Sequence, residues 1–235
     1  MPAKEAAAKF DPSRAAEYER QSRIALAGYD ACHDLGACIL AAALGQGAAA
    51  KILVAGAGGT GNEIIAGGQL EPNWHFVAVD PAQPMLDLAV SRIREAGLES
   101  RTEAVLGYVH DLPETESFDA ATLIGVLHHL PGEEAKLEML DSISARLKKG
   151  APLILAGNHH AYSSKPLLLS AWAERWRMTG STPDEVKAKQ GKILQGADPP
   201  HSEAHVAQLL SLTGFGAPER FFSSLFWGAW VAFRL

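Results

Sequence analysis

The stretch KILVAGAGGTG, residues 51–61, decides the fold of this 235-residue chain. Its first half, residues 51–55, is a short apolar and β-branched run, which predicts a buried parallel strand. Its second half, residues 56–61, has the spacing Gly-x-Gly-x-x-Gly and leads into a helix predicted to start near Asn62. Glycines at this spacing let the chain turn sharply and let a ligand lie against the backbone. The stretch therefore predicts the first strand, turn and helix of a nucleotide-binding sheet.

Predicted strands and helices alternate along the rest of the central region. Apolar runs predict further buried strands, and the segments between them favour helices. The predicted strands are residues 76–80, 103–109, 118–125 and 152–156, with one or two aromatic-rich strands in 221–233, and the predicted helices are residues 29–44, 84–96, 133–147 and 202–212. Alternation of this kind predicts an α/β fold with a Rossmann-like, doubly wound, mostly parallel sheet.

Two helical segments lie outside this alternation. Residues 1–48 are predicted to form an N-terminal helical cap, which begins with a helix-forming stretch at residues 4–9. Residues 157–200 interrupt the strand–helix rhythm and are predicted to form a helical lid. Trp172 and Trp176 lie one helical turn apart there, which fits either packing of the lid or an aromatic wall for a substrate. Nothing marks a second domain, so residues 1–235 are predicted to be one domain.

Charge and cysteine content limit the partners and the compartment. A formal net charge of −6 argues against nucleic acid, whose binders usually carry a basic stripe. The two cysteines, Cys32 and Cys38, fall on different faces of a predicted helix, so no disulfide is expected between them. The N-terminus lacks a signal-like apolar stretch, and the apolar run at residues 35–44 is too short to cross a bilayer. These features predict a cytoplasmic protein without membrane contact and leave the oligomeric state open.

An acidic residue follows the glycine stretch at a suitable distance. Asp80 ends the second predicted strand, nineteen residues after Gly61. A carboxylate in this place can accept hydrogen bonds from the hydroxyls of a ribose. Residues 56–61 together with Asp80 therefore predict an adenosine-containing cofactor, which on these residues alone could be NAD or S-adenosylmethionine.

Further motifs resemble those of class I S-adenosylmethionine-dependent methyltransferases. The sequence Val-Asp-Pro at residues 79–81, followed by Met85, is similar to the second motif of that family. The segment Val-Leu-His-His-Leu-Pro at residues 126–131 and the Lys-Lys-Gly at residues 148–150 continue the resemblance, which covers residues 51–156 well. Phe215 introduces the last predicted strands, as in the family. The resemblance implies a last strand antiparallel to its neighbour, which dehydrogenase folds lack.

The resemblance also implies which residues hold the cofactor. Residues 23–30 are similar to an element of carboxy-S-adenosylmethionine synthases whose tyrosine contacts the amino-acid end of the cofactor, which assigns Tyr29 to the ligand. The complete implied set of cofactor-binding residues is Tyr29, Gly56, Ala57, Gly58, Gly61, Asp80, Pro81, Met85, Val109, His110, Asp111 and Gly125. Three positions depart from the family patterns: Val54 and Tyr108 replace acidic residues, and Gln190 replaces the arginine that grips the extra carboxylate in the synthases.

Candidate catalytic residues follow the fourth and fifth predicted strands, whose carboxyl ends face the reaction crevice of such a sheet. They are His128, Asn158, His159 and Tyr162, and each could instead serve packing. Histidine suits a general base because its pKa lies near neutrality. His201 and His205 share one helix face, but no third metal ligand is evident nearby, so no metal site is predicted.

These residues predict an S-adenosylmethionine-dependent methyltransferase that acts on a small molecule by in-line displacement. One alternative is a lyase that cyclises the methionyl group and releases methylthioadenosine, as azetidine-2-carboxylate synthases do on the same fold. Another is an enzyme similar to carboxy-S-adenosylmethionine synthase. An NAD-dependent oxidoreductase is the alternative of a different class.

Overall fold

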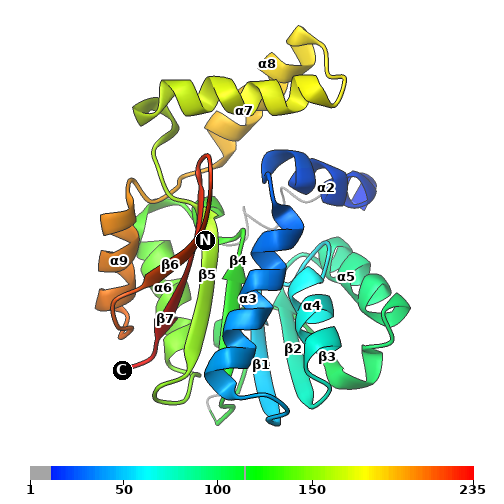
Figure 1. Cartoon of the computed structure of the whole chain (residues 1–235), viewed down its shortest axis with the longest axis vertical. Helices are drawn as coiled ribbons and strands as arrows, with labels where there is room; N and C mark the ends of the chain where they lie inside the picture. Colours follow the sequence, from blue (N-terminus) through cyan, green and yellow to red (C-terminus); the bar gives the residue numbers. More distant parts are fainter. Residues whose placement is uncertain (1–11, 114) are drawn as a thin grey trace.

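A single seven-stranded sheet forms the centre of the computed structural model, which describes residues 12–113 and 115–235. The strands are β1 (Ala50–Ala55), β2 (Trp74–Asp80), β3 (Thr102–Leu106), β4 (Ala120–Ile124), β5 (Pro152–Asn158), β6 (Glu219–Ser224) and β7 (Trp227–Phe233). Their order in the sheet is β3-β2-β1-β4-β5-β7-β6 (Figure 1). β1 to β5 pair in parallel, whereas β7 pairs antiparallel with both β5 and β6. The predicted doubly wound sheet with a reversed last strand is confirmed.

Helices cover both faces of this sheet, and further helices lie above the carboxyl ends of its strands. In the described residues, the helices are α2 (Pro12–Ala25), α3 (Tyr29–Leu44), α4 (Asn62–Leu70), α5 (Gln83–Glu95), α6 (Gly132–Ser144), α7 (Pro166–Met178), α8 (Pro183–Gly196) and α9 (Glu203–Leu212). Strand residues alternate between two hydrophobic clusters, as a pleated sheet buried on both sides requires. Leu53, Leu123 and Leu155 pack with residues of α6 and α9, and Ile52 and Ile154 pack with residues of α3, α4 and α5.

Several predicted boundaries are wrong by a few residues. The third strand was expected to reach Val109, but β3 ends at Leu106 because Gly107 adopts a φ of 153° and turns the chain. Val109, which is buried, then begins a 3-10 turn whose other two residues are exposed. The fourth strand was expected to start at Phe118, which forms only an isolated bridge with Leu147, and that bridge lies beyond the end of α6.

Residues 157–200, the segment predicted to be a lid and called the lid below, contain two helices, α7 and α8, above the carboxyl ends of the parallel strands (Figure 1). Its buried side chains form a hydrophobic cluster of their own, separate from the two sheet clusters. The members are Ile24, Tyr162, Trp172, Trp176, Val186 and Phe226. Two of these residues come from α2 and from the turn between β6 and β7, so the lid is packed against both.

The N-terminal segment divides between two places. α2 lies beside the lid, whereas α3 packs on a sheet face next to α4, so only the first of the two helices caps the sheet (Figure 1). The helix expected at residues 4–9 lies outside the described residues. Among the described helices, none is long and apolar enough by itself to span a membrane; residues 19–25 and α3 meet that test only as a pair, bent by 88°.

Candidate active site

The glycine turn after β1 is closely packed from two sides. β1 and β4 are neighbours at the point where the strand order reverses, which is where ligands bind in open α/β sheets. Gly56 has a φ of 73°, and a Cβ built on it would lie 2.2 Å from Val126 Cγ2 in the turn after β4. A Cβ on Gly58 would lie 2.5 Å from Asp80 Oδ2 and 2.7 Å from Met85 Cβ. These two positions therefore accept only glycine without local rearrangement.

The carboxylate of Asp80 is fixed by the backbone around it. Its Oδ2 accepts a hydrogen bond of 2.9 Å from Gly58 N, and its Oδ1 accepts one of 2.8 Å from Ala82 N. Burial raises the pKa of Asp80, and these two hydrogen bonds oppose that effect by favouring the ionised form. The side chain thus lies at the predicted ribose position, with its oxygens held by the glycine turn and by the start of α5.

Tyr29 joins the N-terminal segment to the same turn. Gly28, with a φ of 83°, reverses the chain between α2 and α3 and so places Tyr29 at the first position of α3. Tyr29 Oη lies 2.6 Å from Thr60 Oγ1, and Tyr29 O lies 2.8 Å from His33 Nδ1. The structure therefore brings Tyr29, which the resemblance assigns to the ligand, together with the glycine turn. Thr60 was missed, because its position inside the glycine motif gives no signal of this partner.

The segment after β3, in which Tyr108 stands where the family pattern has an acidic residue, is held by hydrogen bonds and by ring stacking. Tyr108 N donates a hydrogen bond of 2.8 Å to Asp111 Oδ2, and the Tyr108 and His110 rings stack with centroids 5.3 Å apart. Gly107 N also donates to Asp80 O at 3.1 Å, which holds this segment beside β2. Asp111 therefore provides a carboxylate next to the position that Tyr108 occupies, and Val109 is buried beneath it.

Four predicted cofactor residues have clear packing roles or lie at the edge of the site. Met85 is buried, and its backbone O accepts a hydrogen bond of 2.9 Å from Gly59 N. Ala57 is buried, and its N donates to Val79 O at 3.2 Å. Pro81 is half-buried just after the end of β2. Gly61 has a φ of 59°, and a Cβ built on it would meet the Ile93 side chain. These residues shape the turn around Asp80.

His128 lies buried between the ends of β4 and β5. Its ring centroid is 4.2 Å from that of His129 and 5.4 Å from that of Trp227. A Cβ on Gly157 would lie 2.9 Å from His128 Nδ1, and this nitrogen has no hydrogen-bond partner among the described residues. Burial holds the pKa of His128 well below its usual range, so the imidazole is neutral at pH 7.

Asn158 and Tyr162 form a buried pair at the end of β5. Asn158 Nδ2 donates a hydrogen bond of 2.9 Å to Tyr162 Oη. The Tyr162 ring packs edge-on against Phe226 at 5.0 Å and beside Trp172 at 5.7 Å, inside the lid cluster. Burial raises the pKa of Tyr162, so its hydroxyl stays protonated. The pair therefore connects the sheet with the lid.

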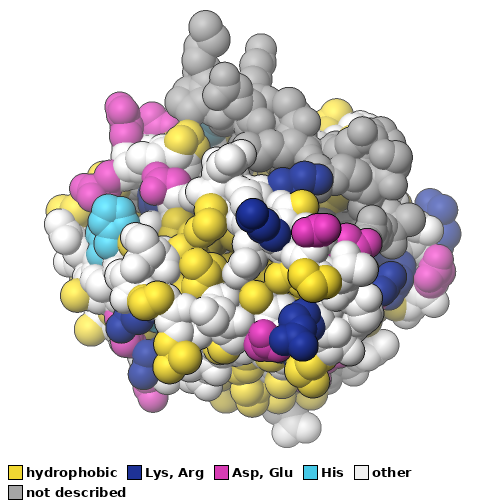
Figure 2. All heavy atoms as spheres, turned by 90° about the horizontal axis from the view of Figure 1, so that it is seen from above, with side chains coloured by type: hydrophobic (Ala, Val, Ile, Leu, Met, Phe, Trp, Pro, Cys, Tyr) yellow, Lys and Arg dark blue, Asp and Glu magenta, His cyan; other side chains and the backbone are white. Residues whose placement is uncertain are grey.

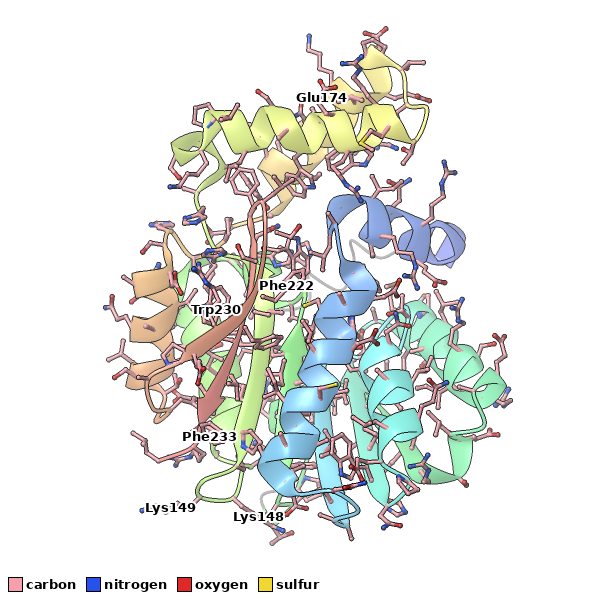
Figure 3. The ribbon with its side chains drawn as sticks, viewed as in Figure 1. Lys148, Lys149, Glu174, Phe222, Trp230 and Phe233 are labelled. Carbon is pink, nitrogen blue, oxygen red and sulfur yellow. The ribbon has the colours of Figure 1, made fainter. Side chains whose placement is uncertain are left out.

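His159 is engaged in contacts away from this pair. Its Nδ1 lies 2.9 Å from Phe226 O, and its ring is perpendicular to Trp230 at 4.9 Å. Burial lowers the pKa of His159 to about 4. Trp230 in turn donates to Glu203 of α9, at 3.2 Å, on the sheet face opposite to α3 (Figure 3). The contacts of His159 are thus with the turn before β7 and with β7 itself.

His201 lies just before α9, and His205 lies inside it. His205 Nε2 lies 3.1 Å from Glu133 Oε2, and His201 N donates to His205 Nδ1 at 3.2 Å. In the described part of the chain, no group of three or more His, Cys, Asp or Glu side chains is arranged to hold a metal ion.

Trp227 is a residue of this region that the sequence analysis missed. It is the first residue of β7 and pairs with Asn158 in the antiparallel register. A Cβ built on Gly125 would lie 3.5 Å from Trp227 Cη2, so the indole reaches across to the end of β4. The aromatic-rich C-terminal sequence was noticed, but only the reversed pairing of β7 places this ring beside Gly125.

Comparisons with known proteins agree with this fold. Residues 54–153 match a family model described as a methyltransferase domain. The structure of mitomycin 7-O-methyltransferase is 19% identical with a TM-score of 0.63, and the match covers 88% of this chain and 55% of that one. An O-methyltransferase family 2 protein from Planctomyces limnophilus, solved with apigenin, is 14% identical with a TM-score of 0.61 and coverages of 79% and 50%. Human N-acetylserotonin methyltransferase, solved with S-adenosylmethionine, is 16% identical with a TM-score of 0.56 and coverages of 78% and 47%.

The chain spans about half the length of these solved structures. No protein of curated function matches its sequence. Residues 54–153, which are less than half of the chain, are thus similar to a methyltransferase domain, and the chain has the fold of the class I S-adenosylmethionine-dependent methyltransferases. S-adenosylmethionine is the cofactor of this class. The comparisons lend no support to a particular closeness to carboxy-S-adenosylmethionine synthases, and Gln190 Nε2 donates to Leu169 O, at 3.1 Å, within the lid.

Proposed function

We propose that this chain transfers the methyl group of S-adenosylmethionine to a small-molecule acceptor enclosed beneath the lid. The observation that carries the proposal is the meeting of Asp80, Tyr29 and the glycine turn at the carboxyl ends of β1 and β2. The aromatic lid cluster reaches Tyr162 at the end of β5, the neighbour of β4. A cofactor held at the first group would present its methyl group toward the second.

The residues present fit the cofactor at two of its three parts. Asp80 would accept hydrogen bonds from the ribose hydroxyls, and the backbone of residues 56–61 would lie against the methionyl part. Tyr29 and Gly125 flank that part from α3 and from β4. For adenine, Asp111 replaces the acidic residue that Tyr108 displaces, and it would accept from the adenine amine.

The bound cofactor supplies an electrophilic methyl group on its sulfonium, so the protein needs mainly to position the acceptor and exclude water. The lid cluster excludes water, and Asn158 and Tyr162 offer polar atoms that could orient an acceptor. His128 is the candidate proton acceptor, because burial keeps it neutral at pH 7 and leaves its Nδ1 without a partner among the described residues. His159 is the weaker candidate, since Phe226 O already engages its Nδ1.

The proposed acceptor is small rather than a nucleic acid. Figure 2 shows the face of the molecule seen from above, and on the described part of it basic and acidic side chains are mixed without a continuous basic stripe. The net charge of −6 has the same implication, because phosphate backbones require clustered Lys and Arg. Binding of tRNA that weakens steeply with added salt would contradict this part of the proposal.

Two measurements test the proposed function. Calorimetry should show micromolar binding of S-adenosylmethionine and S-adenosylhomocysteine and no binding of NAD. Incubation of the purified protein with labelled S-adenosylmethionine should leave the cofactor intact until a metabolite extract is added, when label should appear in a small molecule. Methylthioadenosine formed from S-adenosylmethionine alone, faster than without protein, would favour the lyase reaction and overturn the proposal.

A further inference from the structure

Trp227 differs from the aromatic residues around it in its exposure. Its neighbours Phe226 and Trp230 are fully buried, whereas Trp227 is only half-buried at the start of β7. It packs against the hydrophobic cluster that includes Tyr29 and Ile124, on the sheet face covered by α3. Trp227 therefore keeps part of its surface accessible, whereas Phe226 and Trp230 do not.

The ring lies between residues that the proposed function assigns to the site. Trp227 Cη2 is the nearest heavy atom to a Cβ built on Gly125, at 3.5 Å, and the His128 ring meets the indole edge-on at 72°. Gly125 has a φ of 77° and carries no side chain that would shield the indole. A ligand group placed where a Gly125 side chain would stand would therefore contact this ring.

The cations that lie over aromatic rings in the described residues do not lie over the indole of Trp227. Among the described residues, the two contacts of a cation with an aromatic ring involve Arg23 over Tyr29 and Lys51 over Phe118. The indole of Trp227 has the most negative ring face of the natural aromatic side chains and attracts cations within about 6 Å. The group at the end of β4 would therefore be favoured if it carried a positive charge.

We propose that the indole of Trp227 contacts the trialkylsulfonium group of the cofactor, an inference that rests on the proposed function. In the transfer, the S–CH3 bond breaks with its electron pair staying on sulfur, and the acceptor atom bonds to the methyl group and loses its proton to His128 or to water. The sulfonium thereby becomes an uncharged thioether. Trp227 consequently favours the substrate form of the cofactor over the product form, which assists exchange after each turnover.

Binding of two cofactor forms by three variants tests this role. Calorimetry with S-adenosylmethionine and with S-adenosylhomocysteine measures the ratio of their dissociation constants for the wild type, Trp227→Leu and Trp227→Phe. We expect Trp227→Leu to weaken S-adenosylmethionine binding roughly 2- to 30-fold, the range of cation–aromatic contacts, and to change S-adenosylhomocysteine binding much less. The ratio of the two dissociation constants in Trp227→Phe should lie between the ratios in the wild type and in Trp227→Leu. Phe233→Leu is the matched control, because Phe233 lies at the opposite end of the same strand (Figure 3).

Each outcome decides the proposal. A lost preference in Trp227→Leu with an unchanged ratio in Phe233→Leu supports it. Equal losses for both ligands, or no loss, overturn it while leaving the proposed function standing. A wild type that binds neither ligand overturns the proposed function and with it this inference. If Trp227→Leu does not fold, Trp227→Phe alone decides, since it keeps an aromatic ring in the core and must still shift the ratio.

Discussion

Asp80 and Gly58 contact each other through the Asp80 carboxylate and the backbone N of Gly58. The carboxylate oxygen that accepts from Gly58 N occupies the space where a Cβ on that glycine would stand. Each residue therefore needs the other, which gives two independent substitutions for one site.

Replacement of Asp80 by alanine should weaken binding of S-adenosylmethionine. The expected loss is about 1–3 kcal/mol, because the ribose hydroxyls would lose a partly buried hydrogen-bond acceptor. Asp80→Asn keeps one carbonyl oxygen and should lose less. Calorimetry at pH 7.5 measures both, with circular dichroism as the check on folding. An unchanged affinity in Asp80→Ala would remove this residue from the site.

Gly58→Ala should act on the same contact from the other side. Its Cβ would be forced against Asp80 Oδ2 and Met85 Cβ, so the cofactor should bind more weakly and the melting temperature should fall. Gly191→Ala is the control, because Gly191 lies inside α8 with no atom within 4 Å of the added Cβ. That control should raise the free energy of unfolding by about 0.5–1 kcal/mol. A similar effect of both substitutions would contradict the assignment of Gly58.

At the scale of elements, α7 is tied to the last turn of α2. Trp172 Nε1 donates a hydrogen bond of 2.7 Å to Ala25 O, and Arg175 donates to Ile24 O at 3.3 Å and to Arg23 O at 3.1 Å. These carbonyls are among the four that a helix leaves without internal partners at its end. The lid thus caps α2 four residues before Tyr29, and the two helices are expected to open together.

Arg175→Met should uncouple the opening of α7 from that of α2. It keeps much of the apolar stem and removes the donors, so amide hydrogens at the end of α2 and in α7 should exchange faster in the variant. Arg177→Met is the control, because the Arg177 side chain is exposed and its described contact is an ion pair of 2.7 Å with the exposed Glu174, which Figure 3 labels on α7. Faster exchange confined to α7 would show that α2 does not depend on the lid.

The elements themselves were largely predictable, and their ends and cross-contacts were not. Residues 51–55 and 152–156 are continuous apolar runs between glycines or polar residues, so each was recognised as a buried strand. β3 carries exposed residues and ends where Gly107 turns the chain. The pattern of apolar residues along the sequence predicts neither feature. Thr60 and Trp227 were missed because their partners, Tyr29 and Gly125, are distant in sequence and come together only through the strand order.

At the scale of the molecule, buried histidines make stability depend on pH. The pKa of His159 is about 4 in the folded chain and near 6.5 when unfolded. Between these values the unfolded chain binds a proton that the folded chain excludes, so stability falls as pH drops from about 6.5 to about 4 and is unaffected by this group above 6.5. His160 titrates in the same direction beside it, with Glu203 and Arg220 as the nearby charges.

His159→Gln should flatten this dependence. Urea unfolding at pH 7.5, 6 and 5 should show a wild type that loses stability faster with acid than the variant, by at most about 1 kcal/mol per pH unit after allowance for solvent screening. Asp80 and Glu63, whose pKa values are raised by burial, change stability in the opposite direction, but equally in both proteins. Parallel curves for the two proteins would show that His159 is not held neutral by the fold.

The position of β7 has a consequence for how the chain reaches this fold. β7 follows β6 in the sequence but lies between β5 and β6, so β6 has no strand to pair with until β7 has been inserted. Such an insertion closes contacts between residues far apart in the chain, which slows folding. During synthesis, the edge of β5 would remain open for pairing until residues 227–233 emerge. Trp227 reaches the end of β4 in that same step, so the full affinity for the cofactor should require the completed sheet.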